Sequence, residues 1–407
     1  MAAPSCAPMG TSLDTSENTS ENTSDTMAPP GAEVAGPARV RVIASAQSWI
    51  EGEAVRQLEG TARLAGMRLA VGMPDLHPGK GSPVGAAFAS SGVLHPFLVG
   101  NDIGCGIGLW RTDLPRRKAK RDRWVDRLHG LEGPWDGDTS AWLEAHGVTA
   151  TGPEPALGTI GGGNHFAELS AVSEVMEPDA FGALGLDEGR FVLLVHSGSR
   201  GLGDAILREH TDRFGAGGLE EGTPEAAHYL ARHDRAVGWG RANRALIAQR
   251  FLECVGARGE RVADVCHNSV TPSRLGGERL WLHRKGAAPT DSGPVLIAGS
   301  RGTPSYLVRP VGDGESNACS LAHGAGRRWP RSDARQRLAR RFTAEALTHT
   351  ELGGRVICED KDLLFEEAPQ AYKRIDRVIQ DLTEAGVAEV IAAFSPLITY
   401  KLRAASR

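Results

Sequence analysis

The sequence contains no Cys-x-x-Cys pair, and its six cysteines are scattered over 407 residues. In a chain of this length, that spacing argues against a disulfide framework and favours reduced thiols. No apolar run approaches the roughly 18 residues that a transmembrane helix needs, and the N-terminus lacks the charged-then-apolar order of a signal peptide. We therefore expect a cytoplasmic protein without membrane contact.

The sequence also lacks an excess of positive charge and a Walker A motif. The formal net charge is −4, so any binding of nucleic acid must use a local basic patch. The sequence predicts two basic helices, at residues 115–131 and 332–347, and Ser332 would cap the second. The basic side chains of each helix form either a solvated face or a phosphate-binding surface. The nearest match to Walker A, HPGKGS at 77–82, has Gly81 where that motif requires Ser or Thr.

Residues 1–38 differ in composition from the rest of the chain. A polar near-repeat, TSLDTSENTSENTSDT, precedes a stretch rich in Pro, Gly and Ala. Such a segment buries too little apolar surface to offset the entropy lost on ordering. We predict a disordered, non-catalytic tail at 1–38 and one large domain at 39–407.

The domain mixes strand and helix patterns without the regular strand–helix alternation of a parallel sheet, which favours an α+β fold. Short apolar runs predict strands, and apolar spacings of three and four predict helices. The predicted strands lie at 39–45, 191–195 and 296–297, and the predicted helices outside the basic segments lie at 51–66, 223–255 and 375–394.

Glycine and proline are concentrated at residues 72–111. Glycine permits positive φ and close ligand approach, while proline fixes φ, so we expect tight turns that present Asp102 and Cys105 at the end of a short apolar strand. A carboxylate and a thiolate at this spacing can reach one metal ion or bridge two. The alternative is an ordinary turn with a capping Asp and a buried Cys.

Five of the thirteen histidines lie where an apolar strand or turn meets a loop of small residues. They are His77, His165, His196, His267 and His323. A single histidine in such a place is usually structural, but the repeated pattern indicates metal ligands because imidazole is the commonest one. With the Asp and Cys above, they are enough for a two-metal site. Thiolate and imidazole favour zinc, while the carboxylate leaves manganese open.

Four glycine-rich loops can turn backbone N–H groups toward an anion. Their sequences are GTIGGGN, SGSRGLG, AGSRGT and HGAGR. Ordinary tight turns have the same composition. Arg200, Arg301 and Arg327 lie within three of these loops, and guanidinium pairs with phosphate through two hydrogen bonds, which favours phosphate binding.

Seven motifs, in order along the chain, resemble the RtcB-type RNA ligases. They are NDIGCG (101–106), GGGNHFAE (161–168), HSGSRGLG (196–203), HN (267–268), AGSRGTPSY (298–306), HGAGR (323–327) and EEAPQAYK (366–373). The resemblance implies a single α+β catalytic domain with mixed and antiparallel sheets around a central two-metal cleft. PDLHPGKGSPVGAAF and the glycine in DIGCG look closest to the variant associated with peptide release factor H.

The resemblance implies an enzyme that joins an RNA 3′-phosphate, or a 2′,3′-cyclic phosphate after hydrolysis, to a 5′-hydroxyl in tRNA splicing or RNA repair. GTP and two Mn²⁺ ions would be required; His323 would form a guanylyl-histidine, and Cys105 would bridge the metals. The implied metal ligands are Asp102, Cys105, His165, His196 and His267. The implied nucleotide-binding residues are Asn164, His165, Phe166, Ala167, Glu168, His267, Asn268, Ala298, Gly299, Ser300, Arg301, Ser305, His323, Gly324, Ala325, Gly326 and Lys401.

The chain departs from the family pattern in three places. Arg328-Trp329-Pro330-Arg331 follows HGAGR where the family commonly has a Met-Ser-Arg-like sequence, Ala322 replaces a frequent cysteine, and the chain extends beyond Lys401. Two other functions stay open: a metal-dependent RNA end phosphoesterase, and a non-catalytic RNA-binding rescue accessory. The expected partners are RNA with such ends and GTP, with an archease-like activator or a release-factor-H-like protein as further candidates.

Overall fold

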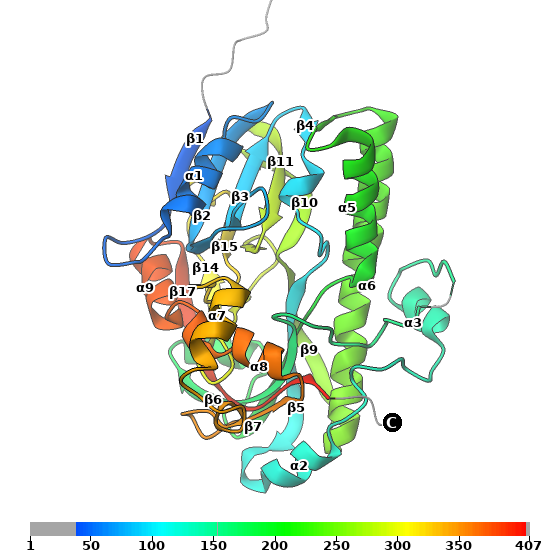
Figure 1. Ribbon diagram of the computed structural model, residues 1–407, viewed down its shortest axis with the longest axis vertical. Helices are drawn as coiled ribbons and strands as arrows, with labels where there is room; N and C mark the ends of the chain where they lie inside the picture. The colour runs from blue at the N-terminus through cyan, green and yellow to red at the C-terminus, as the bar shows by residue number, and fades with distance from the viewer. Residues whose placement is uncertain (1–37, 153, 404–407) are drawn as a thin grey trace, which may run out of the picture. The chain divides into compact units, whose positions relative to one another are not determined.

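Two β-sheets organise the computed structural model, which describes residues 38–152 and 154–403 (Figure 1). The smaller sheet has the strand order β1-β2-β3-β11-β10; the larger has β13-β14-β17-β6-β7-β5-β9, with β16 beside β17. Most neighbouring strands are antiparallel, while β1–β2 and β16–β17 are parallel. The α+β fold with mixed sheets is therefore confirmed. Apart from Ala38, the predicted tail lies outside the described residues.

The strands of the smaller sheet are β1 (Arg39–Val42), β2 (Met67–His77), β3 (Val84–Ser90), β10 (Asn268–Leu275) and β11 (Glu278–Lys285). Those of the larger sheet are β5 (Gly106–Pro115), β6 (Phe166–Val175), β7 (Arg190–Ser197), β9 (Gly259–Cys266), β13 (Val295–Ile297), β14 (Ser305–Pro310), β16 (Arg355–Cys358) and β17 (Ala388–Leu402). Two short pairs complete the strands: β4 (Val93–Leu94) with β8 (Leu219–Glu220), and β12 (Ala287–Pro289) with β15 (Ser320–Ala322).

The α-helices in the described residues are α1 (Gly52–Thr61), α2 (Arg121–Arg127), α3 (Thr139–Ala145), α4 (Pro178–Ala183), α5 (Gly201–Phe214), α6 (Pro224–Val255), α7 (Arg331–Leu338), α8 (Lys361–Glu366) and α9 (Ile375–Glu384). Short 3₁₀ turns lie at Pro96–Leu98, Arg116–Lys118, Ala346–Thr348 and Pro369–Ala371. Within 38–152 and 154–403, none of the helices combines the length and the apolar character needed to cross a membrane.

The long helix α6 forms where the sequence predicts it. The Thr223 side chain accepts a hydrogen bond from the Ala226 amide, Pro224 occupies the first turn, and Gly256 ends the helix at φ 72°. Phe251 and other apolar residues of its buried face pack on the larger sheet. The helix therefore supports β5, β7 and β9 from one side (Figure 1).

The predicted helix at 375–394 is wrong in its second half. The helix α9 ends at Glu384, Gly386 follows with φ 66°, and the chain then enters β17. The early residues Ile375, Val378, Ile379 and Leu382 keep the helical spacing and are buried. The later apolar residues belong to a strand that pairs on both sides, so their near-continuous hydrophobicity reflects burial in a sheet.

Both predicted basic helices are shorter than expected. Residues 115–131 form a 3₁₀ turn and then the seven-residue helix α2. Within 332–347 the α-helix α7 stops at Leu338, and the helix starts one residue earlier than expected, at Arg331, with Pro330 rather than Ser332 at the N-cap position. The stretch at 72–111 is also more regular than predicted, because β2, β3 and β5 take up much of it and Asp102 and Cys105 precede β5.

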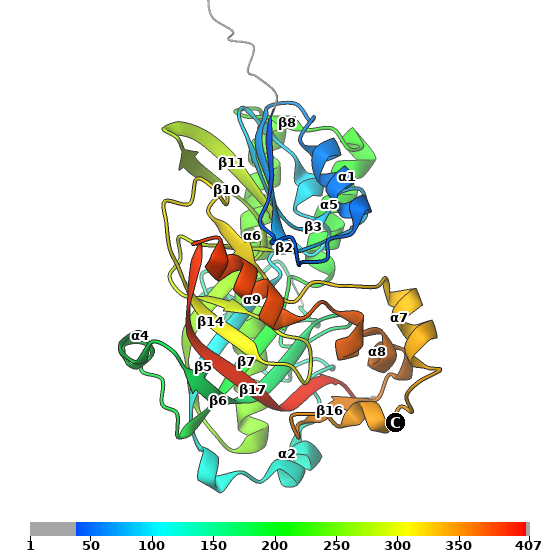
Figure 2. The ribbon, with the colours of Figure 1, turned by 90° about the vertical axis from the view of Figure 1, so that its left-hand side faces the viewer.

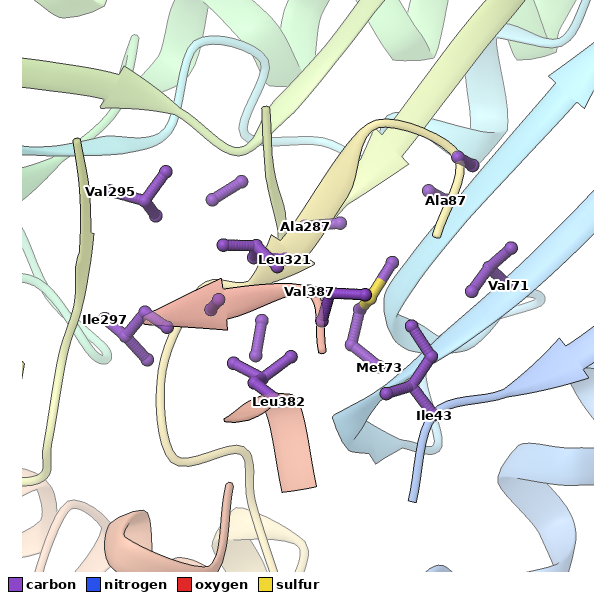
Figure 3. Close-up of a cluster of buried hydrophobic side chains, with 14 of the residues drawn as sticks. Ile43, Val71, Met73, Ala87, Ala287, Val295, Ile297, Leu321, Leu382 and Val387 are labelled. Atoms are coloured by element: carbon purple, nitrogen blue, oxygen red, sulfur yellow. The ribbon is translucent and has the colours of Figure 1, made fainter. Parts of the chain in front are cut away.

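A buried apolar cluster joins the two sheets. It contains Val71 and Met73 from β2, Ile297 from β13 and Leu382 from α9 (Figure 3). The helix α9 packs against β2 of the smaller sheet and β17 of the larger one (Figure 2). Because one core spans both sheets, the loops that leave the ends of their strands are held close to one another.

Candidate metal and nucleotide site

The predicted metal ligands meet because four neighbouring strands of the larger sheet begin or end at the same level. Gly106, the first residue of β5, pairs with Ser197 at the end of β7 and with Cys266 at the end of β9. Phe166, the first residue of β6, pairs with His196. The residues just outside these pairs must therefore lie together. They are Asp102 and Cys105 before β5, His165 before β6, and His267 after β9, beside His196 in β7.

The five side chains form two groups that share Cys105. One contains Cys105, His196 and His267, the other Asp102, Cys105 and His165, and the ligand atoms within each group lie within 4.8 Å of one another. The Cys105 Sγ is 3.4 Å from the Nε2 atoms of His165 and of His196. The His196 and His267 Nε2 atoms are 3.3 Å apart, and Asp102 Oδ2 is 2.9 Å from His165 Nε2. Two adjacent cation positions bridged by one thiolate fit this arrangement.

The chemistry of these residues fits divalent cations. Burial lowers the pKa values of His196 and His267 well below the usual range, so both rings are neutral and can donate a lone pair. Burial and the nearby Asp102 raise the pKa of Cys105, which a bound cation would reverse by stabilising the thiolate. Asp102 Oδ1 is buried without a hydrogen-bond partner in the described part of the chain. An unpaired carboxylate oxygen beside a thiol and three imidazoles is the donor set of a metal centre.

Arg244, on α6, fixes the loops that carry these ligands. Its Nη1 donates to the carbonyls of Gly104 and Ser197 at 2.8 Å each, and its Nε donates to Asp264 at 2.9 Å. The Arg244 side chain is fully buried, and that of Asp264 is 4% exposed. One guanidinium therefore links the segment before Cys105 to the end of β7.

We expect Arg244→Met to destabilise the protein by about 3–5 kcal/mol, because Asp264 would remain buried without its partner. Arg241 is a matched control, since it approaches Asp264 only at 3.8 Å and is 52% exposed. Arg241→Met should change the free energy of unfolding by about 0.5 kcal/mol or less. Chemical denaturation of both variants measures the difference. Equal destabilisation would show that the buried ion pair does not hold these loops.

His323 lies next to the metal-ligand cluster and contacts a carboxylate that sequence reasoning missed. Its side chain is 12% exposed, and its ring centroid is 4.9 Å from that of His267. The fully buried Asp75 places Oδ2 2.6 Å from His323 Nδ1 and accepts a hydrogen bond from the His323 backbone N–H at 3.3 Å. Among the described residues Nδ1 has no partner that meets the geometry of a hydrogen bond, but the adjacent carboxylate favours a proton there. Nε2 then keeps its lone pair.

A cavity of about 360 Å³ opens beside this pair and reaches both the predicted metal ligands and the glycine-rich loops. Its volume is in the range of small-ligand pockets. Gly286, at φ 63°, forms part of its wall, and a Cβ there would lie 2.8 Å from the His323 ring. The predicted nucleotide-binding residues that line it are Asn164, Phe166, His267, Asn268, Ala298, Gly299, Ser300, Arg301, His323, Gly324, Ala325, Gly326 and Lys401.

Four predicted nucleotide-binding residues lie behind the cavity wall. His165 belongs to the ligand cluster, Ala167 packs into the core on the far side of β6, and Ser305 accepts a hydrogen bond from the Gly299 amide. Glu168 is buried and accepts hydrogen bonds from Ser170 and Thr399. Burial raises the pKa of Glu168 to about 7 despite those hydrogen bonds.

The cavity also contains Arg331, Glu367 and Tyr372, to which the sequence assigned no role, beside Arg327, which it predicted to bind phosphate. Arg327 and Arg331 approach Glu367 at 3.0 and 3.2 Å, and Tyr372 donates a hydrogen bond to the same carboxylate. Burial alone would raise the pKa of Glu367, but Lys401 and Arg327 outweigh it and bring the pKa to about 2. Burial lowers the pKa of Lys401 to about 8. Glu367 and Tyr372 lie within the motif EEAPQAYK, which was the only sequence signal for them.

The fold and the site together define a class of protein. An α+β scaffold holds a cluster suited to two cations beside a histidine with a free nitrogen, in a cavity walled by glycine loops and arginines. This combination is typical of enzymes that transfer phosphoryl or nucleotidyl groups with metal ions.

The chain belongs to the RtcB family, whose model, described as tRNA-splicing ligase RtcB, matches residues 57–131 and 145–402. The RNA-splicing ligase RtcB2 of Escherichia coli (strain ATCC 25922) is 50% identical over 365 residues, covering 89% of this chain and 95% of that protein. RNA-splicing ligase RtcB1 of the same strain is 30% identical, covering 86% and 95%. The RNA-splicing ligase RtcB of Mycobacterium tuberculosis is 31% identical, covering 84% and 99%. The expected family membership is therefore confirmed.

Proposed function

We propose that this protein is a GTP- and Mn²⁺-dependent RNA ligase that joins 3′-phosphate or 2′,3′-cyclic phosphate ends to 5′-hydroxyl ends. The observation that carries the proposal is the position of His323, which lies beside the metal-ligand cluster with Nδ1 next to Asp75. A metal-dependent phosphoesterase that activates water would need the cluster but would not need a histidine as guanylyl acceptor. Residues 39–407 would act as one ligase domain.

His323 Nε2 is the proposed nucleophile. With the proton on Nδ1, next to the Asp75 carboxylate, the lone pair on Nε2 attacks the α-phosphorus of GTP. A P–N bond forms, the bond to the β-phosphate oxygen breaks, and pyrophosphate leaves. The Asp75 carboxylate stabilises the positive charge that develops on the ring. The product is a guanylyl-histidine.

Asp102, Cys105, His165, His196 and His267 would hold two manganese ions, with Cys105 shared between them. When bound, such ions neutralise phosphate charge and orient an in-line displacement. The chain's own residues fix the ligand atoms: Gly198 leaves space for Asp102, since a Cβ there would lie 2.2 Å from Oδ1. The donor set would also accept zinc, so manganese rests on the family resemblance.

The cavity wall would bind the guanine nucleotide. Lys401, Ser300 and Arg301 line it. The family resemblance assigns the guanine edge to Glu168, which lies outside the lining and accepts a hydrogen bond from Thr399, a residue of the lining. The guanylate would then pass to the RNA 3′-phosphate, and the 5′-hydroxyl would displace GMP to form the new phosphodiester. Each step exchanges one bond at phosphorus for another.

The names of the relatives support an RNA substrate, since they are called RNA-splicing or tRNA-splicing ligases. The chain is more similar to RtcB2 than to RtcB1 of one E. coli strain, at 50% against 30% identity. RNA repair alongside a release-factor-H-like protein, help from an archease-like activator and a cytoplasmic location remain predictions. The non-catalytic character of residues 1–38 also remains a prediction.

Two short RNAs, one with a 3′-phosphate or cyclic phosphate and one with a 5′-hydroxyl, test the proposal directly. The wild type should join them with GTP and Mn²⁺, and His323→Ala should form no product. His349→Ala is the matched control, because His349 is exposed and lies outside the cavity. A wild type that opens the cyclic phosphate without joining the strands would indicate the phosphoesterase. No reaction at the RNA ends would favour the accessory.

A further inference from the structure

Four arginines and a tryptophan near the cavity mouth form a surface to which the proposed reaction assigns no role. We call Arg328, Trp329, Arg337, Arg340 and Arg341 the arginine surface. Residues 327–341 contain seven arginines and a single acidic residue, Asp333. Three of these arginines are paired: Arg327 and Arg331 with Glu367, and Arg335 with Asp362. Within residues 38–152 and 154–403, the four arginines of the surface form no ion pair.

The arginine surface is rigid at its centre. The Cζ atoms of Arg328 and Arg337 lie 5.4 and 5.1 Å from the centroid of the Trp329 ring, which is half-buried against the core around α7 and α8. The backbone N–H groups of Arg328 and Trp329 both donate to the Ala371 carbonyl, at 2.8 and 3.3 Å. Both guanidinium groups lie within cation–π distance of the indole, and planar guanidinium groups can stack with further flat groups.

The arginine surface is continuous with the catalytic cavity. Arg327 and Arg331 line the cavity, and they flank Trp329 in the sequence. Arg327 Nε donates a hydrogen bond to the Trp329 carbonyl at 3.0 Å. Arg331 is 50% exposed, so it reaches from the cavity wall to the outer surface. The helix α7, which contains Arg337, lies beside α8 (Figure 2).

We propose that the arginine surface binds the unpaired RNA strand that leads to the reacting end in the cavity. This inference rests on the proposed ligase function, which makes RNA the substrate. Phosphates would contact the exposed guanidinium groups, and bases would stack on the guanidinium planes beside Trp329. An acidic protein would also complement the positive charge of the arginine surface. It would not account for the continuity of this surface with a cavity that holds a nucleophile and metal ligands.

The other basic segment is the matched control. Arg117 and Lys118 follow the last residue of β5, whereas Asp102 and Cys105 precede its first residue. A strand of ten residues spans about 30 Å. Arg116 donates to the Val172 and Glu188 carbonyls, near the end of β6 and the start of β7 that lie away from the ligand cluster. This segment therefore lies at the opposite end of the sheet from the site.

Fluorescence anisotropy with a labelled, 3′-phosphorylated single-stranded RNA of about 12 nucleotides tests the proposal on the full chain. At about 0.15 M salt, Arg328→Ala/Arg337→Ala should weaken Kd about 10-fold and reduce the slope of log K against log salt by about 1.4. Arg328→Lys/Arg337→Lys should keep the slope and weaken Kd about 3-fold, because charge remains but stacking is lost. Arg117→Ala/Lys118→Ala should leave Kd and slope unchanged.

Several outcomes would overturn the proposal. Unchanged RNA binding in the double alanine variant would do so, as would an equal loss in the Arg117 and Lys118 control. If polyglutamate competed with RNA at the same affinity, the surface would fit an acidic protein instead. The lysine variant keeps the test valid if the alanine variant unfolds on heating earlier than the wild type. Because binding is measured without GTP or Mn²⁺, a failure of the ligase chemistry remains distinguishable from a failure of this surface.

Discussion

Cys105→Ala is expected to lower bound manganese from about two ions per chain to less than one, and to reduce RNA joining by about 10³-fold or more. The reason is geometric. Both candidate ligand groups include Cys105, and its Sγ lies 3.4 Å from a nitrogen in each. Removing a side chain that binds only one ion would leave the second ion in place. Removing the shared sulfur instead weakens the binding of both ions. Metal analysis of the purified protein after dialysis measures the loss.

The control for this prediction is Cys254→Ala. Cys254 lies on α6, is half-buried, and belongs to neither ligand group. Its replacement should leave metal content and joining activity unchanged. Retention of two ions by Cys105→Ala would contradict the shared-ligand arrangement, whatever the effect on activity.

Asp75→Asn is expected to slow guanylylation by about 10²–10⁴-fold while leaving metal content unchanged. Asparagine is nearly the same size, but its amide can present an N–H group to His323 Nδ1. That contact favours the tautomer with the proton on Nε2, where the nucleophilic lone pair is required. The loss should therefore appear in the rate of adduct formation, measured in a single turnover with GTP and Mn²⁺.

Asp381→Asn is a matched control, because Asp381 is another buried carboxylate, and its oxygens accept hydrogen bonds from Ser45 and Ser48 instead of contacting His323. Its replacement should leave the guanylylation rate within about 3-fold of wild type. An Asp75→Asn variant that reacts equally fast would show that Asp75 does not set the His323 tautomer.

The candidate metal ligands could be predicted from the sequence because each lies at or near the end of an apolar strand. Antiparallel pairing then brings those strand ends to one level, as the pairs Gly106–Ser197 and Gly106–Cys266 do. The predicted strands at 191–195 and 296–297 and the predicted helix at 223–255 are confirmed, because their patterns are local.

The parts that could not be predicted depend on long-range contacts. Asp75 and His323 are 248 residues apart in the sequence, and no local pattern around either residue predicts their contact. The end of α9 is similar: Gly386 breaks the helix, and the apolar residues after it are buried by neighbouring strands rather than by a helical face. Arg244 lies within the predicted helix at 223–255, and no sequence pattern indicated that its side chain would be fully buried.

The most direct test of the central claim is incubation of the wild type with Mn²⁺ and GTP labelled at the α-phosphate, followed by mapping of the labelled residue. The account predicts an acid-labile adduct of one guanylate on His323, absent from His323→Ala and unchanged in His349→Ala. No adduct on a wild type shown to contain manganese would contradict the ligase mechanism. An adduct on another residue would keep the ligase mechanism but contradict the role of the His323–Asp75 pair.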